Sequence, residues 1–204
     1  AEPVKLWDEA RRAVSAYEMY KNGLGIVTTY EQLPDMWGTK PPMLIWLQTL
    51  SYHAFGVSTF ALRFPSALAG FCCCMILLII WGSFRGTHFG GIFSALILIS
   101  TYGFVGYHSA RTGDFDALLS LWVLAAASSF FFYFEQRRPW QLLLFFFFLS
   151  LACLTKGVAG LFILPGLAVF VFIQNGFLRK LLLTRSFYFG VLMFVAIVFG
   201  FYFG

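Results

Sequence analysis

Six long apolar stretches dominate the chain after residue 60, with short polar segments between them. They cover residues 61–82, 89–107, 117–134, 139–154, 157–173 and 187–204. A helix of about 17–25 apolar residues crosses a bilayer, so we expect six transmembrane helices here. The fourth and fifth stretches are short and nearly fused through Thr155, Lys156 and Gly157, which predicts either a tight helical hairpin or one long broken helix. The pattern indicates an all-α polytopic membrane protein.

Residues 1–60 mix polar and apolar positions, unlike the long apolar stretches that follow them. Their first apolar stripe, at spacings of three and four, comprises Trp7, Ala10, Val14 and Tyr17. This spacing predicts an amphipathic helix over about 5–21 that ends at Asn22-Gly23. A second helix is expected over 43–55, because the prolines of Lys40-Pro41-Pro42 fix a turn from which a helix can start. We expect residues 1–60 to form a loop with amphipathic juxtamembrane helices.

Composition strengthens this picture. Of the 204 residues, 60% are hydrophobic and 11% are charged, whereas a soluble domain is about 25% charged. These values exclude a soluble fold and a disordered chain. The net charge of +5 does not indicate a nucleic-acid partner, because the basic residues lie in short segments between apolar runs. The four cysteines lie in apolar runs without the spacing of a metal site, so they are interpreted as packing residues.

Charge asymmetry orients the predicted spans. Connections on one side carry Arg85, Glu135, Arg137, Arg138, Arg179, Lys180 and Arg185. This basic set is expected in the cytoplasm. Residues 1–60, the loop 108–116 and Lys156 then share the outer face of the membrane. Because residues 1–60 would have to be carried across the membrane, we expect an upstream transmembrane helix, and further helices downstream, beyond this sequence.

An ordered set of motifs gives the chain a family resemblance. It comprises Trp7-Asp8-Glu9-Ala10-Arg11, Glu18-Met19, Lys40-Pro41-Pro42, Trp46-Leu47, Phe55-Gly56, Leu62-Arg63-Phe64-Pro65-Ser66, the run 110–119 (ARTGDFDALL) and Thr155-Lys156-Gly157. The set resembles polyprenyl-phosphate-sugar-dependent glycosyltransferases of the GT-C fold. These include bacterial aminoarabinose transferases and dolichyl-phosphate-mannose protein mannosyltransferases. The resemblance covers most of the chain and implies the N-terminal part of a GT-C-type transmembrane helix bundle with interfacial outer-face helices.

The resemblance also implies site residues. Asp8 stands at the position of the catalytic aspartate, the base that takes a proton from the acceptor, and Asp116 matches the second family aspartate. Glu9 and Asp114 are expected to support them, and Asp114 could replace Asp116. The residues expected to bind the lipid phosphate are Arg11, Lys40, Arg111 and Lys156. We expect Asp8 and Asp116 to face one cavity.

The residues themselves leave simpler interpretations open. Asp8 could pair with Arg11 or Arg12 one helical turn on. Asp116 could be a helix-start acid paired with Arg111, a role compatible with catalysis. Lys156 lies isolated between two apolar spans, where a lysine needs a partner such as a phosphate, Asp116 or water.

Two positions depart from the family pattern. Aminoarabinose transferases carry an acid directly before Lys-Pro-Pro that helps to bind a metal, and here Thr39 stands in its place. An aromatic residue often follows the family arginine, and here it is Arg12. No cofactor is therefore assigned, and Thr39 weakens the case for a divalent metal. His53, His88 and His108 are scattered and form no histidine cluster in the sequence.

We interpret the chain as part of a cell-envelope glycosyltransferase. It is expected to move a sugar from a polyprenyl-phosphate donor to a lipid or protein acceptor, with inversion, at the outer face of the membrane. One alternative is a transporter or flippase that uses the same charges as a solute pathway, although no convincing internal repeat supports it. The other is an inactive member of the family that acts as a scaffold.

Overall fold

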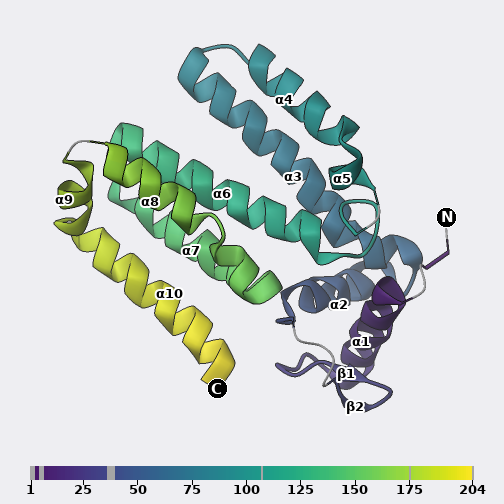
Figure 1. Cartoon of the computed structure of the whole chain (residues 1–204). Coiled ribbons are helices and arrows are strands. Elements are labelled where there is room, and N and C mark those ends of the chain that lie inside the picture. The colour runs from purple at the N-terminus through teal and green to yellow at the C-terminus, as the bar shows by residue number, and fades with distance from the viewer. Residues whose placement is uncertain (1–2, 5–6, 36–39, 107, 175, 204) are drawn as a thin grey trace. The chain divides into compact units, whose positions relative to one another are not determined.

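The computed structural model describes residues 3–4, 7–35, 40–106, 108–174 and 176–203 (Figure 1). Its elements are α1 (Asp8–Asn22), β1 (Thr29–Tyr30), β2 (Leu33–Pro34), α2 (Met43–Phe55), α3 (Thr59–Arg85), α4 (Phe89–Ser100), α5 (Tyr102–Val105), α6 (Phe115–Gln136), α7 (Pro139–Lys156), the 3₁₀ helix η1 (Gly157–Leu161), α8 (Leu164–Ile173), α9 (Phe177–Leu182) and α10 (Arg185–Phe203). The chain divides into two compact units, Ala1–Leu121 and Trp122–Gly204, and the division falls within α6.

In the first unit, α1, α2 and the β1–β2 hairpin gather at the N-terminal end of α3 (Figure 1). Their shared apolar core contains Ala16, Met19, Ile45, Tyr52, Ala61 and Leu62. Ser58 caps α3 by accepting a hydrogen bond from the amide of Ala61 at 3.2 Å. Gly91 of α4 lies directly on the α3 backbone, because a Cβ there would be 2.8 Å from the Cα of Leu78. The helices α3 and α4 are therefore closely packed.

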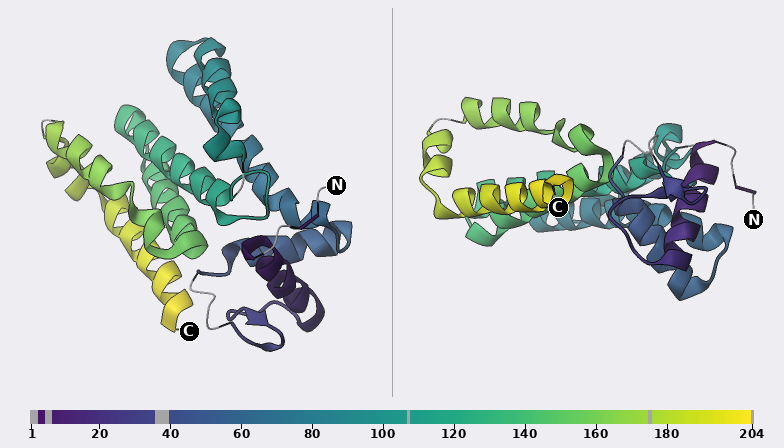
Figure 2. Two further views of the ribbon diagram at one scale, coloured as in Figure 1. Left: turned by 45° about the vertical axis from the view of Figure 1, so that its right-hand side comes forward. Right: turned by 90° about the horizontal axis from the view of Figure 1, so that it is seen from below.

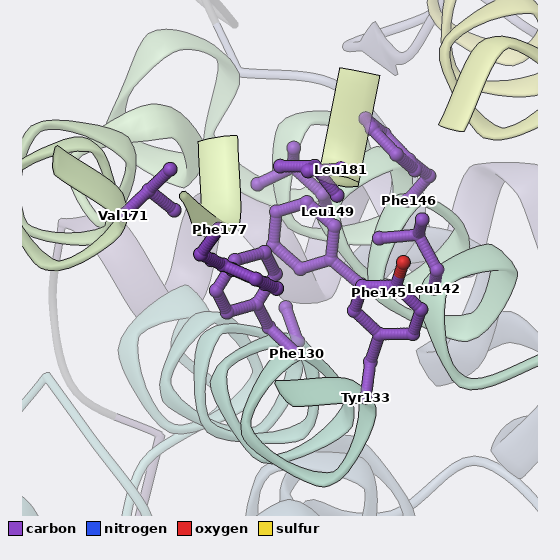
Figure 3. Close-up of a cluster of buried hydrophobic side chains, with 10 residues drawn as sticks. Phe130, Tyr133, Leu142, Phe145, Phe146, Leu149, Val171, Phe177 and Leu181 are labelled. Atoms are coloured by element: carbon purple, nitrogen blue, oxygen red, sulfur yellow. The ribbon is translucent and has the colours of Figure 1, made fainter. Parts of the chain in front are cut away.

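The second unit has a largely aromatic core (Figure 3). Its buried members come from α6, α7, α8 and α9: Ala126, Phe130, Tyr133, Leu142, Phe145, Phe146, Leu149, Val171, Phe177 and Leu181. The helix α10 packs on α7 at Gly190, where an added Cβ would be 2.2 Å from the ring of Phe146.

The structure shows a turn between the fourth and fifth apolar stretches. The helix α7 ends at Lys156, and Gly157 adopts a positive φ of 59°. A Cβ on Gly160 would lie 2.7 Å from the backbone of Ala152 and Cys153, so η1 folds back onto the end of α7. Figure 2 shows α8 running from this turn towards α9, and α10 returning in the opposite direction. This is a hairpin and not a continuous helix.

Among the described residues, four helical segments are long and apolar enough to cross a membrane: Thr59–Phe84, Phe115–Gln136, Pro139–Leu161, which comprises α7 and η1, and Arg185–Phe203. The stretches 89–107 and 157–173 contain the shorter apolar helices Phe89–Ser100 and Leu164–Ile173. The first of these stretches is interrupted at Thr101, where α4 ends before α5. Six crossings of the membrane stay a prediction.

Two features were not expected. The antiparallel pair β1–β2 forms a small hairpin inside residues 1–60, and α9 is an additional short helix between α8 and α10. The predicted helix over 43–55 matches α2, and α1 ends at Asn22 as the Asn22-Gly23 signal indicates.

Candidate functional site

The N-terminal helix α1 buries its polar side. Its buried residues are Glu9, Arg12, Ser15, Ala16, Glu18 and Met19. By contrast, Trp7 of the apolar stripe is 88% exposed and Tyr17 is also exposed. Ala10 and Val14 of the same stripe are half-buried, so the stripe is only partly exposed. Exposed apolar side chains of this kind suit a helix at a membrane surface. The buried acids and arginine need partners, because burying an unpaired charge is strongly unfavourable.

Glu9 joins α1 to two other segments. Its carboxylate accepts two hydrogen bonds from Arg63 of α3, from Nε at 2.7 Å and from Nη2 at 2.9 Å. It also accepts one from the backbone N–H of Gly113 at 2.9 Å. Its side chain is 1% exposed. Glu9 therefore positions the start of α1 against the loop that precedes α6, and its expected supporting role in catalysis stays a prediction.

The loop before α6 is held from α2 and α3 as well. Gln48 donates a hydrogen bond to the carbonyl of Gly113 at 3.2 Å, and Ser66 donates one to the carbonyl of Asp114 at 2.9 Å. A Cβ on Gly113 would lie 2.9 Å from Nε2 of Gln48 and 3.2 Å from Cγ of Leu62, so only glycine fits without a shift. This packing places Asp114 beside α1.

Asp114 pairs with Arg12. Nη2 of Arg12 donates to Oδ1 of Asp114, and both side chains are almost fully buried, at 8% and 7% exposed. The hydroxyl of Thr112 donates to the other oxygen of Asp114 at 3.1 Å. Burial lowers the pKa of Arg12, whereas the charges of Asp8, Asp116 and Glu9 raise it. Asp114 is thus a buried, neutralised carboxylate and not one that faces solvent.

Asp8 is the open carboxylate of the site. It begins α1, its side chain is 61% exposed, and Oδ2 lies 3.8 Å from Nη2 of Arg12. The ion pair expected one turn along the helix therefore forms with Arg12. An exposed carboxylate held at one oxygen by a fixed cation can accept a proton from a group that approaches from outside.

Asp116 lies in the first turn of α6, where the helix dipole favours an anion. It is half-buried, and its charge acts on Arg12 together with that of Asp8. Both aspartates that the resemblance selects therefore belong to the surroundings of one guanidinium.

The four candidate phosphate-binding cations have different surroundings. The exposed Lys40 places Nζ 5.0 Å from the ring centroid of Phe115, and Cζ of Arg12 is also 5.0 Å from that centroid. Arg111 is exposed and lines one part of an apolar groove of about 590 Å³ formed by α3, α4 and α5. Lys156 ends α7 and belongs to the second unit.

Arg11 points towards the β1–β2 hairpin. It forms two hydrogen bonds with the carboxylate of Asp35, one of them from Nε at 3.0 Å, and its Cζ lies 4.7 Å from the centroid of the Tyr30 ring. The hydrogen bonds to Asp35 raise the pKa of Arg11. The structure thus gives Arg11 a structural partner, and a role at the phosphate stays a prediction.

One group of side chains has the spacing of a metal site. Asp8, His108 and Asp114 each offer a ligand atom, and these atoms lie within 4.8 Å of one another. Arg12, however, already contacts both carboxylates with one nitrogen, so these side chains do not suit a cation as the structure stands. Thr39, where the family acid is expected, lies outside the described residues.

Reasoning from the sequence missed the roles of Arg12 and His108. The sequence marks Arg12 as a departure from the family pattern and as a local partner of Asp8, but its buried contact with Asp114 joins residues 102 positions apart. His108 places Nδ1 3.3 Å from Oδ2 of Asp114. The Arg12 contact has no local sequence signal, because it depends on the loop 108–114 folding onto α1. The His108 contact depends on the conformation of that loop itself.

Comparison with known proteins places the chain in a family. A family model described as dolichyl-phosphate-mannose-protein mannosyltransferase matches residues 39–202. The chain belongs to this family. Among curated relatives, an uncharacterized protein of Aquifex aeolicus (strain VF5) is 31% identical over 188 residues, which are 91% of this chain and 36% of that protein. An undecaprenyl phosphate-alpha-4-amino-4-deoxy-L-arabinose arabinosyl transferase of Shewanella sediminis (strain HAW-EB3) is 32% identical over 129 residues, 59% of this chain and 22% of the relative.

Two solved structures share the fold of the chain. ArnT from Cupriavidus metallidurans, crystallised with undecaprenyl phosphate, superposes with a TM-score of 0.82 at 21% identity. Its apo form gives 0.80 at 22%. In each case the match covers 97% of this chain and 36% of the other. The mannosyltransferase-family chain is therefore a multi-pass membrane protein of the GT-C type, and it spans about a third of the length of these relatives.

Proposed function

We propose that this family member is the N-terminal part of a membrane glycosyltransferase. It moves a sugar from a polyprenyl-phosphate donor to a lipid or protein acceptor at the outer face of a bacterial cytoplasmic membrane. The observation that carries the proposal is the meeting of two distant segments at Arg12, which leaves the carboxylate of Asp8 exposed. Family membership supports the same reaction class.

In the proposed reaction, Asp8 is the general base. A hydroxyl or amine of the acceptor attacks the anomeric carbon of the donor sugar, and its proton passes to the carboxylate of Asp8. The bond between the anomeric carbon and the phosphate oxygen breaks, and its electron pair leaves with the polyprenyl phosphate. A single displacement of this kind inverts the anomeric configuration.

The leaving phosphate needs positive charge beside it. Lys40 supplies it in the proposed site, because its ammonium group lies against Phe115, between Asp114 and Asp116 in the sequence. Arg111 is a second candidate, since it combines an exposed cation with the edge of an apolar groove that fits an isoprenoid chain. Lys156 is retained as a candidate on the family pattern.

The outer-face location rests on the distribution of basic residues. In the second unit, Tyr133 and Thr184 are joined by a 3.2 Å hydrogen bond, and Arg137 stacks on Phe177 with Cζ 4.4 Å from the ring centroid. The basic segments 137–138 and 179–185 therefore meet at one end of that unit, as the positive-inside rule requires of a cytoplasmic end.

The proposal is tested by transfer from a purified polyprenyl-phosphate sugar with the full-length protein in nanodiscs. We expect polyprenyl phosphate to be released only with a suitable acceptor present, and the product to carry the inverted anomer by NMR. Movement of the intact sugar lipid across a vesicle membrane, without cleavage in any acceptor mixture, would instead establish the flippase alternative.

A further inference from the structure

The guanidinium of Arg12 is buried beside a cluster of possible metal ligands, formed by Asp8, His108 and Asp114. Their ligand atoms lie within 4.8 Å of one another, and carboxylate and imidazole groups at this spacing can bind a divalent cation. Nη2 of Arg12 is 3.8 Å from the carboxylate of Asp8 and donates to that of Asp114. A permanent positive charge is therefore already present where a metal ion would be bound.

Arg12 is fixed in this position from several sides. Its side chain is buried against the ring of Phe115. Its partner Asp114 is held through its side chain by Thr112 and through its carbonyl by Ser66. Burial lowers the pKa of Arg12 and the charges of Asp8, Asp116 and Glu9 oppose this, and an arginine stays protonated because its ordinary pKa is very high.

We propose that Arg12 is the resident cation of this cluster and a positioning residue for Asp8. Arg12 neutralises the carboxylates of Asp8 and Asp114, as a divalent metal could. Neither carboxylate therefore binds a metal in the wild-type protein. A metal ion bound to the same oxygens would lie within a few ångströms of the guanidinium, and the two like charges would repel strongly. The role of Asp8 as a base rests on the proposed function, whereas the role of Arg12 as the resident cation does not.

Arg12 also positions the carboxylate of Asp8. The guanidinium is anchored by Asp114 and contacts Oδ2 of Asp8, whose carboxylate is otherwise exposed. Without this contact, the carboxylate of Asp8 would lose its ion pair with Arg12 and would lie close to an unneutralised Asp114. A base displaced by about 1 Å can lose about 10²-fold in rate.

Metal binding tests the cation directly, in the full-length protein purified in detergent. Wild-type protein should hold no stoichiometric Mn²⁺ or Zn²⁺ by elemental analysis, and its thermal midpoint should be the same in EDTA as with either ion. Arg12→Met frees both carboxylates, so its midpoint should be low in EDTA and rise by several degrees with Mn²⁺ or Zn²⁺. Lys21→Met removes one exposed positive charge from the same helix and should respond like the wild type.

A wild-type protein that binds one equivalent of either ion, or that loses stability or activity in EDTA, overturns the proposal. A folded Arg12→Met protein whose thermal midpoint does not rise with either ion also overturns the proposal. If Arg12→Met does not fold, the wild-type measurements alone decide.

Kinetics test the positioning role. Arg12→Met should lower kcat for transfer by at least about tenfold with the KM of the donor unchanged, and Arg12→Lys should restore part of the loss because it returns the charge. An unchanged kcat in folded Arg12→Met contradicts this role. If the wild type performs no transfer, the proposed function fails while the metal measurements still test Arg12 as the resident cation.

Discussion

Arg12 and Asp114 form a buried ion pair across 102 positions of sequence. The same nitrogen of Arg12 reaches Asp8 at 3.8 Å, so one guanidinium links the first helix to the loop before α6. Glu9 reinforces the junction through Arg63 and the N–H of Gly113. The candidate site is therefore a tertiary structure and not a property of either segment alone.

Gly113 should be sensitive to the addition of a single methyl group. In Gly113→Ala, the Cβ would lie 2.9 Å from Gln48 and 3.3 Å from the carbonyl of Leu62, so the loop carrying Asp114 must shift. We expect a loss of about 1–3 kcal/mol in stability, seen as a lower thermal midpoint, together with reduced transfer.

Gly103→Ala is the matched control in the same unit, because a Cβ there meets nothing within 4 Å. Equal behaviour of the two variants would show that the close approach at Gly113 does not position the loop.

Lys40→Met should weaken use of the donor. Removing an ammonium group that binds a phosphate is expected to raise the KM of the sugar donor by about tenfold, since hydrogen bonds to charged groups contribute about 1.5–3 kcal/mol. Lys156→Met should also raise the KM of the sugar donor if Lys156 contacts the phosphate. An unchanged donor KM in Lys40→Met, with Lys21→Met as the control, would remove Lys40 from the site.

Arg138 should be cytoplasmic. In a background without the four native cysteines, Arg138→Cys should react with an impermeant maleimide only after cells are permeabilised, because the basic set is expected inside. Leu24→Cys, in an exposed segment of residues 1–60, should react in intact cells. Labelling of Arg138→Cys from outside would invert the topology and misplace the proposed reaction.

The turn after α7 should depend on Gly160. A methyl group in Gly160→Ala would meet the backbone of Ala152 and Cys153 at 2.7 Å, which cannot move aside as a flexible side chain can. We expect a loss of about 1–3 kcal/mol, measured by thermal unfolding. Gly166→Ala, where a Cβ meets nothing within 4 Å, should be close to neutral. Equal midpoints would mean that η1 does not pack on α7 as described.

Periodicity and composition predicted most of the helices, but not the short helix α9, the break at Thr101 or the contacts between helices. The bounds of α2 follow from Pro41-Pro42 and Gly56, which are local signals. The β1–β2 hairpin has no such signal, because its turn places Glu31 and Gln32 at positive φ, where glycine or asparagine would have indicated it.

Some features of the candidate site could likewise be predicted from the sequence, and others could not. Family resemblance selected Asp8 and Asp116, and the structure relates both to one guanidinium. The burial of Arg12 could not be predicted, because in the sequence it lies on the polar side of an amphipathic helix and its partner is in a distant loop. The pairing of Arg11 with Asp35 likewise depends on the hairpin.

Transfer by Asp8→Asn tests the central claim most directly. The substitution keeps the size and polarity of the side chain but removes the base, so kcat should fall by about 10²–10⁴-fold. Stability should change by no more than about 0.5 kcal/mol, because the carboxylate is exposed and its contact with Arg12 is long. Glu31→Gln, an exposed acid outside the site, should transfer sugar like the wild type. Near-normal transfer by folded Asp8→Asn would contradict the assignment of Asp8 as the base.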